Sequence, residues 1–344
     1  MSLPISRFDY ELPRDLIAQT PADPRDSSRL LLVERATRQL IDHEFLDLPS
    51  LLLPGDLVIL NDTRVIPARL FAHRSTGGRV ELLLLGRVST GTWTALARPA
   101  KRLRVNERLT LLDRAGEETS DAVSVVSHEG ESVTVTFSDE SAIDRCGAAP
   151  LPPYIHERLD DDERYQTVYA NRLGSAAAPT AGMHFTDRVL SACEDRGVSF
   201  ARITLHVGLD TFQPIKTDDA HHHQMHSELF EVPVETARII RDAKATNRRV
   251  VAVGTTSVRT LESAAASIFA GGDVPIRNAT RLFITPGYDF RIVDAMLTNF
   301  HLPRTTLMLL VSALAGEDVI RAAYTHAIHE QYRFLSFGDA MLIV

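Results

Sequence analysis

The chain has 344 residues, of which 44% are hydrophobic and 24% are charged, and these proportions exclude a disordered protein. Its length predicts about two domains. The net charge of −8 excludes a general electrostatic affinity for nucleic acid, although it leaves room for a local basic patch.

Two short apolar runs near the start, RLLLVE at 29–34 and DLVILN at 56–61, predict strands of a sheet. A different pattern follows, in which short β-type runs alternate with glycine-bearing turns: RVELLLLGRV, TWTALA, ERLTLL, AVSVVS and SVTVTF. Such regular short strands predict a small antiparallel barrel or sandwich. A proline-rich hinge, AAPLPPYI, ends the segment. We therefore expect an inserted β-barrel domain at 69–150 within a larger domain formed by 1–68 and 151–344.

After the hinge, predicted helices and strands alternate. Thr186 can cap a helix that stops at Gly197, and a strand, VSFARITLHVG, follows at 198–208. The continuous apolar run RVVAVG predicts a buried parallel strand. The remaining predicted elements are helices at 234–249 and 257–272 and strands RLFITPG and AMLIV. This alternation predicts an α/β layered domain with helices on the faces of its sheet.

One basic cluster lies inside the predicted barrel. The run ARPAKRLRVNER at 97–108 contains Lys101, Arg102 and Arg104. It is typical either of a solvated strand edge or of a surface that contacts phosphates.

Polar residues gather at the ends of predicted strands, where α/β sheets place their ligands. Asp62 and Arg64 follow DLVILN. Thr255 and Thr256 follow RVVAVG and precede a helix that carries Arg259. The second cluster indicates either a cradle for a phosphate or carboxylate, or plain helix capping. It lacks the glycine patterns of dinucleotide folds and P-loops.

Further polar candidates occur later in the chain. His184 precedes a predicted helix, and His206 lies inside a predicted strand, where a histidine is either a core residue or a catalyst. The other polar candidates are Asp339, which precedes the last predicted strand, and four residues within the stretch 294–301: Asp294, Thr298, Asn299 and His301.

The stretch HHHQMHSE at 221–228 allows two interpretations, a histidine-ligated metal hydrolase or a segment that handles protons. Neighbouring histidines point in different directions, and no further ligand set is evident. We therefore favour proton handling over a metal site, and the family resemblance given below implies that His223, His226, Ser227 and Glu228 are the members involved.

The chain offers little sign of a membrane or an oxidising compartment. Its longest apolar run, LMLLVSALAG, is about half of the ~20 residues that a membrane span needs. No secretory signal is evident at the N-terminus, and two cysteines cannot form a disulfide framework. We therefore expect a cytoplasmic protein that does not contact a membrane. The sequence has no heptad repeat that would indicate a coiled coil, so we also expect a monomer.

Long phrases in a consistent order resemble the S-adenosylmethionine:tRNA ribosyltransferase-isomerase family of queuosine biosynthesis. They include FDYELPRDLIAQTPADPRDSSRLL, LNDTRVIPARL, AAPTAGMHFT, LHVGLDTFQPI, MHSE, VGTTSVRTLE, FITPGYDFRIVDAMLTNFHLPRTTLMLLVSALAG and YRFLSFGDAMLI, and they cover essentially the whole chain. Asp210 departs from the glycine common at its place.

The resemblance implies transfer of the ribosyl group of S-adenosylmethionine to 7-aminomethyl-7-deazaguanine at the wobble position of a tRNA anticodon. The sugar isomerises to an epoxycyclopentane, giving epoxyqueuosine-tRNA, and adenine and methionine leave. S-adenosylmethionine is then a substrate, and no other cofactor and no metal are expected. The alternatives are a histidine-ligated metal hydrolase and a non-enzymatic RNA-binding protein.

The resemblance also implies roles for the residues in the matched phrases. Glu228 or His226 would take the C5′ proton that the sulfonium acidifies, and Asp294 and His301 complete the catalytic candidates. Asp294 and Asn299 would contact the adenosine or the aminomethyl group. The loop with Arg259 would hold the methionine carboxylate or a tRNA phosphate. The expected substrate-binding residues are Asp62, Arg64, His184, His206, Ser227, Thr255, Thr256, Arg259, Thr298, Asn299 and Asp339, and Lys101, Arg102 and Arg104 would contact tRNA.

Overall fold

The computed structural model describes residues 2–130, 132–157, 159, 161–208 and 214–344; Asp210 lies outside these ranges. The chain forms two compact units. Unit 1 comprises 1–63, 152–172 and 178–344, and unit 2 comprises 64–151 and 173–177. The longer segment of unit 2 encloses the range 69–150 that the sequence pattern assigned to an inserted barrel.

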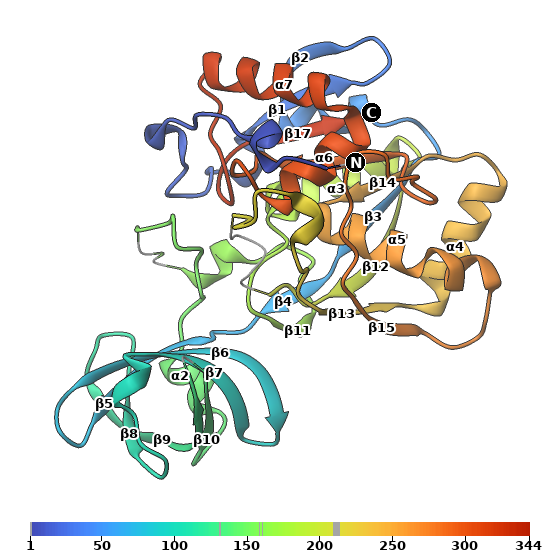
Figure 1. Ribbon diagram of the computed structural model, residues 1–344. Coiled ribbons are helices and arrows are strands. Elements are labelled where there is room, and N and C mark those ends of the chain that lie inside the picture. The colour runs from blue at the N-terminus through green and yellow to red at the C-terminus, as the bar shows by residue number, and fades with distance from the viewer. Residues whose placement is uncertain (1, 131, 158, 160, 209–213) are drawn as a thin grey trace. The chain divides into compact units, whose positions relative to one another are not determined.

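Unit 2 is a closed antiparallel barrel (Figure 1). Within the described residues its strands follow the order β10-β7-β6-β5-β8-β9 around the barrel. Alternate residues such as Leu82 and Leu84 point into one apolar core, which explains the period-2 pattern of the sequence. The elements are β5 (Arg69–Arg74), β6 (Arg79–Ser89), β7 (Thr92–Arg98), β8 (Arg108–Leu112), β9 (Glu118–Glu129), β10 (Ser132–Phe137) and the short helix α2 (Ala142–Cys146).

Unit 1 is built on a mixed sheet that, in the described part of the chain, has the order β15-β13-β12-β3-β14-β16-β17-β1-β2. Its strands are β1 (Arg29–Glu34), β2 (Gln39–Glu44), β3 (Leu57–Asn61), β12 (Ser199–Leu205), β13 (Glu228–Val232), β14 (Val250–Val253), β15 (Ile276–Thr280), β16 (Ala295–Asn299) and β17 (Ala340–Ile343). Strands β12, β3, β14 and β16 run parallel to one another, so their carboxyl ends share one edge of the sheet.

Helices cover both faces of this sheet, as predicted. On one face, Val189 and Cys193, one helical turn apart, pack with alternate residues of the central strands. On the other, α5 contacts β14, α4 lies beside α5, and α7 contacts β1 (Figure 1). The helices are α1 (Leu48–Leu51), α3 (Asp187–Asp195), α4 (Val234–Ala245), α5 (Thr255–Ala270), α6 (Thr306–Ala315) and α7 (Glu317–His329).

The remaining elements are short. Strands β4 (Thr63–Val65) and β11 (Arg172–Ser175) form a separate two-stranded sheet. Single 3₁₀ turns occur at Ile5–Phe8, Arg14–Leu16, Arg25–Ser27, Phe45–Asp47, Ala100–Arg102, Asp162–Tyr165, Thr180–His184 and Ala220–His222. No helix in the described ranges is long and apolar enough to cross a membrane.

Three local predictions were wrong. RLFITPG at 281–287 is a loop, not a strand, because β15 ends just before it and the Leu282 backbone binds side chains: its N–H donates to the Thr280 hydroxyl, and its carbonyl accepts from Arg259 Nε. His206 lies one residue beyond the end of β12, not inside it. Thr186 precedes α3, but its hydroxyl donates to Asp26 and does not cap the helix.

Candidate active site

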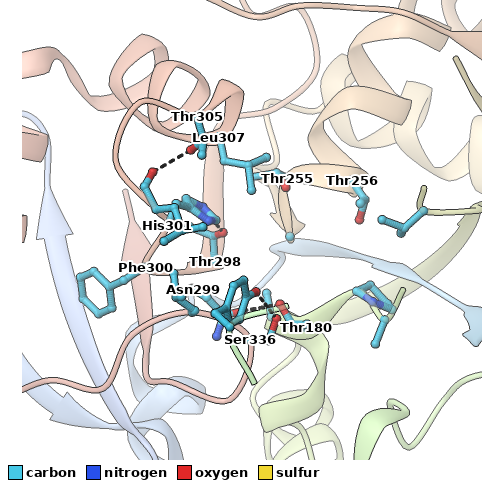
Figure 2. Close-up of a pocket in the computed structure, with 18 residues that line it drawn as sticks. Thr180, Thr255, Thr256, Thr298, Asn299, Phe300, His301, Thr305, Leu307 and Ser336 are labelled. Atoms are coloured by element: carbon cyan, nitrogen blue, oxygen red, sulfur yellow. Dashed lines mark hydrogen bonds between the residues drawn. The ribbon is translucent and has the colours of Figure 1, made fainter. Parts of the chain in front are cut away.

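A pocket opens where the parallel strands of unit 1 end. Hydroxyl groups dominate its polar lining, so we call it the threonine pocket (Figure 2). The polar side chains that line it are Tyr154, Thr180, Thr255, Thr256, Thr298, Asn299, His301, Thr305 and Ser336. No Lys, Arg, Asp or Glu is among the described residues of this lining. The pocket therefore suits a polar but uncharged group.

The turn from β14 into α5 forms one wall of the threonine pocket. Gly254 has a φ of +82°, a conformation that residues with a Cβ rarely adopt, and it lets the chain turn directly from strand to helix. The hydroxyl of Thr256 accepts a hydrogen bond from Asn61 Nδ2 at 3.2 Å. The Thr255 hydroxyl makes no hydrogen bond to any residue that the structure describes. Thr255 is thus available to a ligand, whereas Thr256 is held in place.

Asn299, at the end of β16, is held by three neighbours. Thr180 donates to its Oδ1 at 2.9 Å, and its Nδ2 donates to His184 Nε2 at 3.1 Å and to the backbone carbonyl of Asp339 at 3.3 Å. His184 does not line the threonine pocket and lies behind Asn299. The predicted substrate-binding His184 therefore positions Asn299.

The protonation of His184 follows from these contacts. Burial, assisted by the positive charges of Arg333 and Arg25, lowers the pKa of His184 to about 3, so the imidazole is neutral. An amide N–H can only donate, so Nε2 accepts and Nδ1 carries the proton. Nδ1 lies 2.7 Å from the Ser28 hydroxyl and donates to it.

His301 lines the threonine pocket directly. Its Nε2 lies 3.1 Å from the Thr298 hydroxyl (Figure 2). Two tyrosines hold its backbone: His301 N–H donates to the Tyr324 hydroxyl at 2.9 Å, and the Tyr10 hydroxyl donates to the His301 carbonyl. Burial lowers the pKa of His301 to about 3, so this side chain also presents a neutral imidazole.

A second pocket adjoins the first, since Leu307 lines both. It contains ionisable side chains, and we call it the charged pocket: Lys216, His222, His223, His226, Glu228 and Arg259. Glu228 and Arg259 form a buried ion pair, and Glu228 Oε1 also accepts the Gly208 N–H at 2.9 Å. The predicted segment 223–228 is thus brought together with Arg259.

Within that segment the residues differ in exposure. His226 and Ser227 are exposed, and His223 is half-buried with its ring 5.6 Å from that of Phe283. Burial and the nearby charge of His226 lower the pKa of His223. Glu228 is therefore the buried ionisable member of the segment.

Other predicted site residues lie outside both pockets. Asp294 precedes β16, at the opposite edge of the sheet from Asn299, and its carboxylate binds Lys244 Nζ at 2.8 Å. The Asp339 carboxylate accepts the backbone N–H groups of Arg29 and Arg333 at 3.0 and 2.7 Å. These contacts stabilise the fold and argue against the roles predicted for both aspartates.

Asp62 and His206 lie near the carboxyl edge but do not line either pocket. Asp62 accepts the Thr204 hydroxyl at 2.6 Å, and His206 Nδ1 lies 2.9 Å from the Thr63 hydroxyl. Burial lowers the pKa of His206. Arg64 belongs to unit 2.

The basic run occupies the surface of unit 2. Lys101, Arg102 and Arg104 are all exposed. Lys101 and Arg102 form no ion pair with any described residue, so their charges are open to a partner.

Sequence reasoning missed Thr180, Thr305 and Ser336, although each lies in a quoted phrase. It selected the lining residues Thr255, Thr256, Thr298 and Asn299, but its other candidates were mostly titratable residues, whereas the lining consists mainly of hydroxyls. Among the described residues, no group of three or more His, Cys, Asp or Glu side chains could hold a metal ion.

Comparison with known proteins covers the whole chain. Residues 5–343 match the model of a family described as queuosine biosynthesis protein. The chain is 50% identical, over 99% of both chains, to S-adenosylmethionine:tRNA ribosyltransferase-isomerase of Symbiobacterium thermophilum. The crystal structure of S-adenosylmethionine tRNA ribosyltransferase from Thermotoga maritima has a TM-score of 0.57 and 36% identity, over 98% of this chain and 100% of that one. This chain belongs to the queuosine biosynthesis protein family.

Proposed function

We propose that this protein transfers the ribosyl group of S-adenosylmethionine to 7-aminomethyl-7-deazaguanine in the anticodon of a tRNA and isomerises it to the epoxycyclopentane of epoxyqueuosine. Adenine and methionine are released. The observation that carries this proposal is the 50% identity along 99% of both chains. Membership of the family favours this transferase over a metal hydrolase and over a non-enzymatic RNA-binding protein.

The threonine pocket suits the adenosine part of S-adenosylmethionine. Adenine and ribose are uncharged and carry several hydrogen-bond donors and acceptors. Thr255, Asn299 and the neutral imidazole of His301 offer both kinds of group without a net charge. Because Asn299 is held on three sides, it can orient a ligand with little loss of side-chain entropy.

The reaction begins with loss of a C5′ proton, which the adjacent sulfonium makes acidic. Glu228 is the proton acceptor in this proposal, because it is buried and lines a pocket that adjoins the adenosine site, whereas His226 is exposed. Asp294 has no part in it, because it lies at the other edge of the sheet and binds Lys244.

The tRNA substrate requires a surface that binds phosphates. Lys101, Arg102 and Arg104 supply exposed positive charge on the barrel despite the overall charge of −8. The target base belongs to a loop, so it can leave its stack without the opening of a long duplex.

The test is a reaction with S-adenosylmethionine and tRNA that carries the aminomethyl precursor base. Chromatography would follow free adenine and methionine, and mass spectrometry of digested tRNA would detect epoxyqueuosine. The same tRNA with an unmodified guanine is the control. Adenine release that does not depend on the precursor base, or no release at all, would contradict the proposal.

A further inference from the structure

The charged pocket contains a buried cation with an unused donor. The side chains of Arg259 and Glu228 are 6% and 5% exposed. Arg259 Nη1 donates to Glu228 Oε2, and Nε donates to the Leu282 carbonyl at 3.1 Å. Its Nη2 is buried and has no hydrogen-bond partner among the described residues. A buried guanidinium N–H without a partner is costly, so this nitrogen is prepared for an acceptor that a ligand brings.

The charge around this donor suits a single anion. Glu228 neutralises Arg259, and Lys216, an exposed side chain of the same pocket, adds a positive charge. Two cations and one carboxylate leave a net charge of about +1 before any histidine is protonated. Because Glu228 holds one side of the guanidinium, Nη2 has a defined direction in which to bind an oxygen.

The two pockets are continuous along the chain as well as in space. Leu307 lines both, Thr305 lines the threonine pocket, and Thr306 lines the charged pocket. One molecule with an uncharged polar end and another end that bears a carboxylate can therefore occupy both. S-adenosylmethionine has this form, since its adenosine carries no anionic group and its amino-acid end carries a carboxylate.

We infer that the charged pocket binds the α-carboxylate of the methionine part of S-adenosylmethionine, through Arg259 Nη2 and Lys216, while the adenosine occupies the threonine pocket. This inference rests on the proposed function. Glu228 orients Arg259 and stays close to the sulfonium end of the substrate. Arg259 is thus the specificity residue that distinguishes adenosine thioethers with an amino-acid end from those without one.

The test uses two inhibitors that share the adenosine thioether and differ in the amino-acid end, which carries the inferred contact. S-adenosylhomocysteine carries the amino-acid end, and 5′-methylthioadenosine lacks it. Their inhibition constants are measured against S-adenosylmethionine with saturating precursor tRNA, or by equilibrium dialysis with unmodified tRNA if a variant is inactive. In Arg259→Lys the constant for S-adenosylhomocysteine should rise roughly 10- to 100-fold, the loss expected for hydrogen bonds to a charged group, and that for 5′-methylthioadenosine should not change. Lys216→Gln should give the same selectivity with a smaller rise.

Arg249→Lys is the matched control. Arg249 also binds a buried carboxylate, Asp56, with Nη2 to Oδ2 at 2.6 Å, but both residues precede their strands at the opposite edge of the sheet. This variant should leave both inhibition constants unchanged. The decrease in its melting temperature measures how much an Arg→Lys substitution in an ion pair destabilises unit 1 without touching the pocket.

The outcomes separate the inference from the proposed function. Equal weakening of both inhibitors by Arg259→Lys overturns the inference. A higher KM for tRNA with both inhibition constants unchanged also overturns it and assigns the pocket to a phosphate. Either result can occur with an active wild type, whereas failure of the proposed function appears as a wild type that releases no adenine.

Discussion

Two buried histidines make the stability of unit 1 depend on pH. His184 and His301 each have a pKa lowered to about 3, chiefly by burial. In the unfolded chain an imidazole has its ordinary pKa of about 6.5. Between those values the unfolded state binds protons that the folded state excludes, so lowering the pH from 7.5 to 5 should destabilise unit 1.

The magnitude follows from the two pKa values. For each histidine, the free energy of unfolding decreases by about 1.4 kcal/mol for every pH unit below the pKa of the unfolded state. At pH 5 this amounts to ~2 kcal/mol for each and ~4 kcal/mol for the pair, relative to pH 7.5. Burial lowers the pKa of His206 and His223 as well, which adds in the same direction. Carboxylates with lowered pKa values lose their contribution only below about pH 4.

Two spectroscopic signals can follow the two units separately. Trp93, the single tryptophan of the chain, lies on β7 of the barrel, so its fluorescence follows unit 2. Far-ultraviolet circular dichroism follows the helices, and the long ones, α3 to α7, belong to unit 1. Denaturant titrations at pH 7.5, 6 and 5 should therefore show the loss in the dichroism transition.

Substitution isolates the contribution of one histidine. In His184→Gln the loss between pH 7.5 and 5 should shrink by ~2 kcal/mol, because one proton site is removed. His329→Gln, at a side chain that is 82% exposed, should keep the wild-type dependence. Two results would refute the reasoning: an unfolding free energy of unit 1 that does not change between pH 7.5 and 5, or a His184→Gln variant that loses as much of it as the wild type.

Three further measurements test the site. Glu228→Gln should lower kcat for adenine release roughly 10²- to 10⁴-fold, the range for loss of a general base, and full turnover would remove Glu228 as proton acceptor. Tyr324→Phe removes the acceptor of the His301 N–H and should lower the unfolding free energy of unit 1 by about 1–3 kcal/mol in the dichroism transition. A change below experimental error would show that this hydrogen bond does not stabilise the backbone at His301. The double variant Lys101→Gln, Arg102→Gln should weaken tRNA binding and reduce the slope of log affinity against log salt by about 1.4, whereas an unaltered slope would exclude this surface.

The fold was predictable where local pattern and tertiary burial agree. The run VVAV at 250–253 is apolar throughout because β14 is covered on both faces, and the alternation in β6 reflects one face in the barrel core. The loop 281–287 was missed because its apolar residues have β propensity, while the Leu282 carbonyl accepts a hydrogen bond from the side chain of Arg259, 23 residues earlier, and not from a neighbouring strand.

The sequence predicted the edge of the sheet at which the candidate site lies, but only some of the residues that line its pockets. Asp294 and Asn299 stand five positions apart in one phrase, yet they lie at opposite ends of the same strand, and strand direction in the sheet decides which one lines the threonine pocket. His184 looked like a ligand-binding residue, but its ring faces Ser28 and Asn299. A sequence shows which side chains can react; the order of strands in the sheet decides which of them meet.

Strand β17 has a consequence for how the molecule is made. It lies between β16 and β1 and, within the described sheet, it alone joins the β1–β2 hairpin to the other strands. The ribosome synthesises the β1–β2 hairpin before the other strands of this sheet and β17 after them. Until β17 has been synthesised, the edge of β1 that pairs with it has no partner strand. A nascent chain that stalls before residue 340 would expose that edge, and chaperones that hold extended segments are the natural means of protecting it.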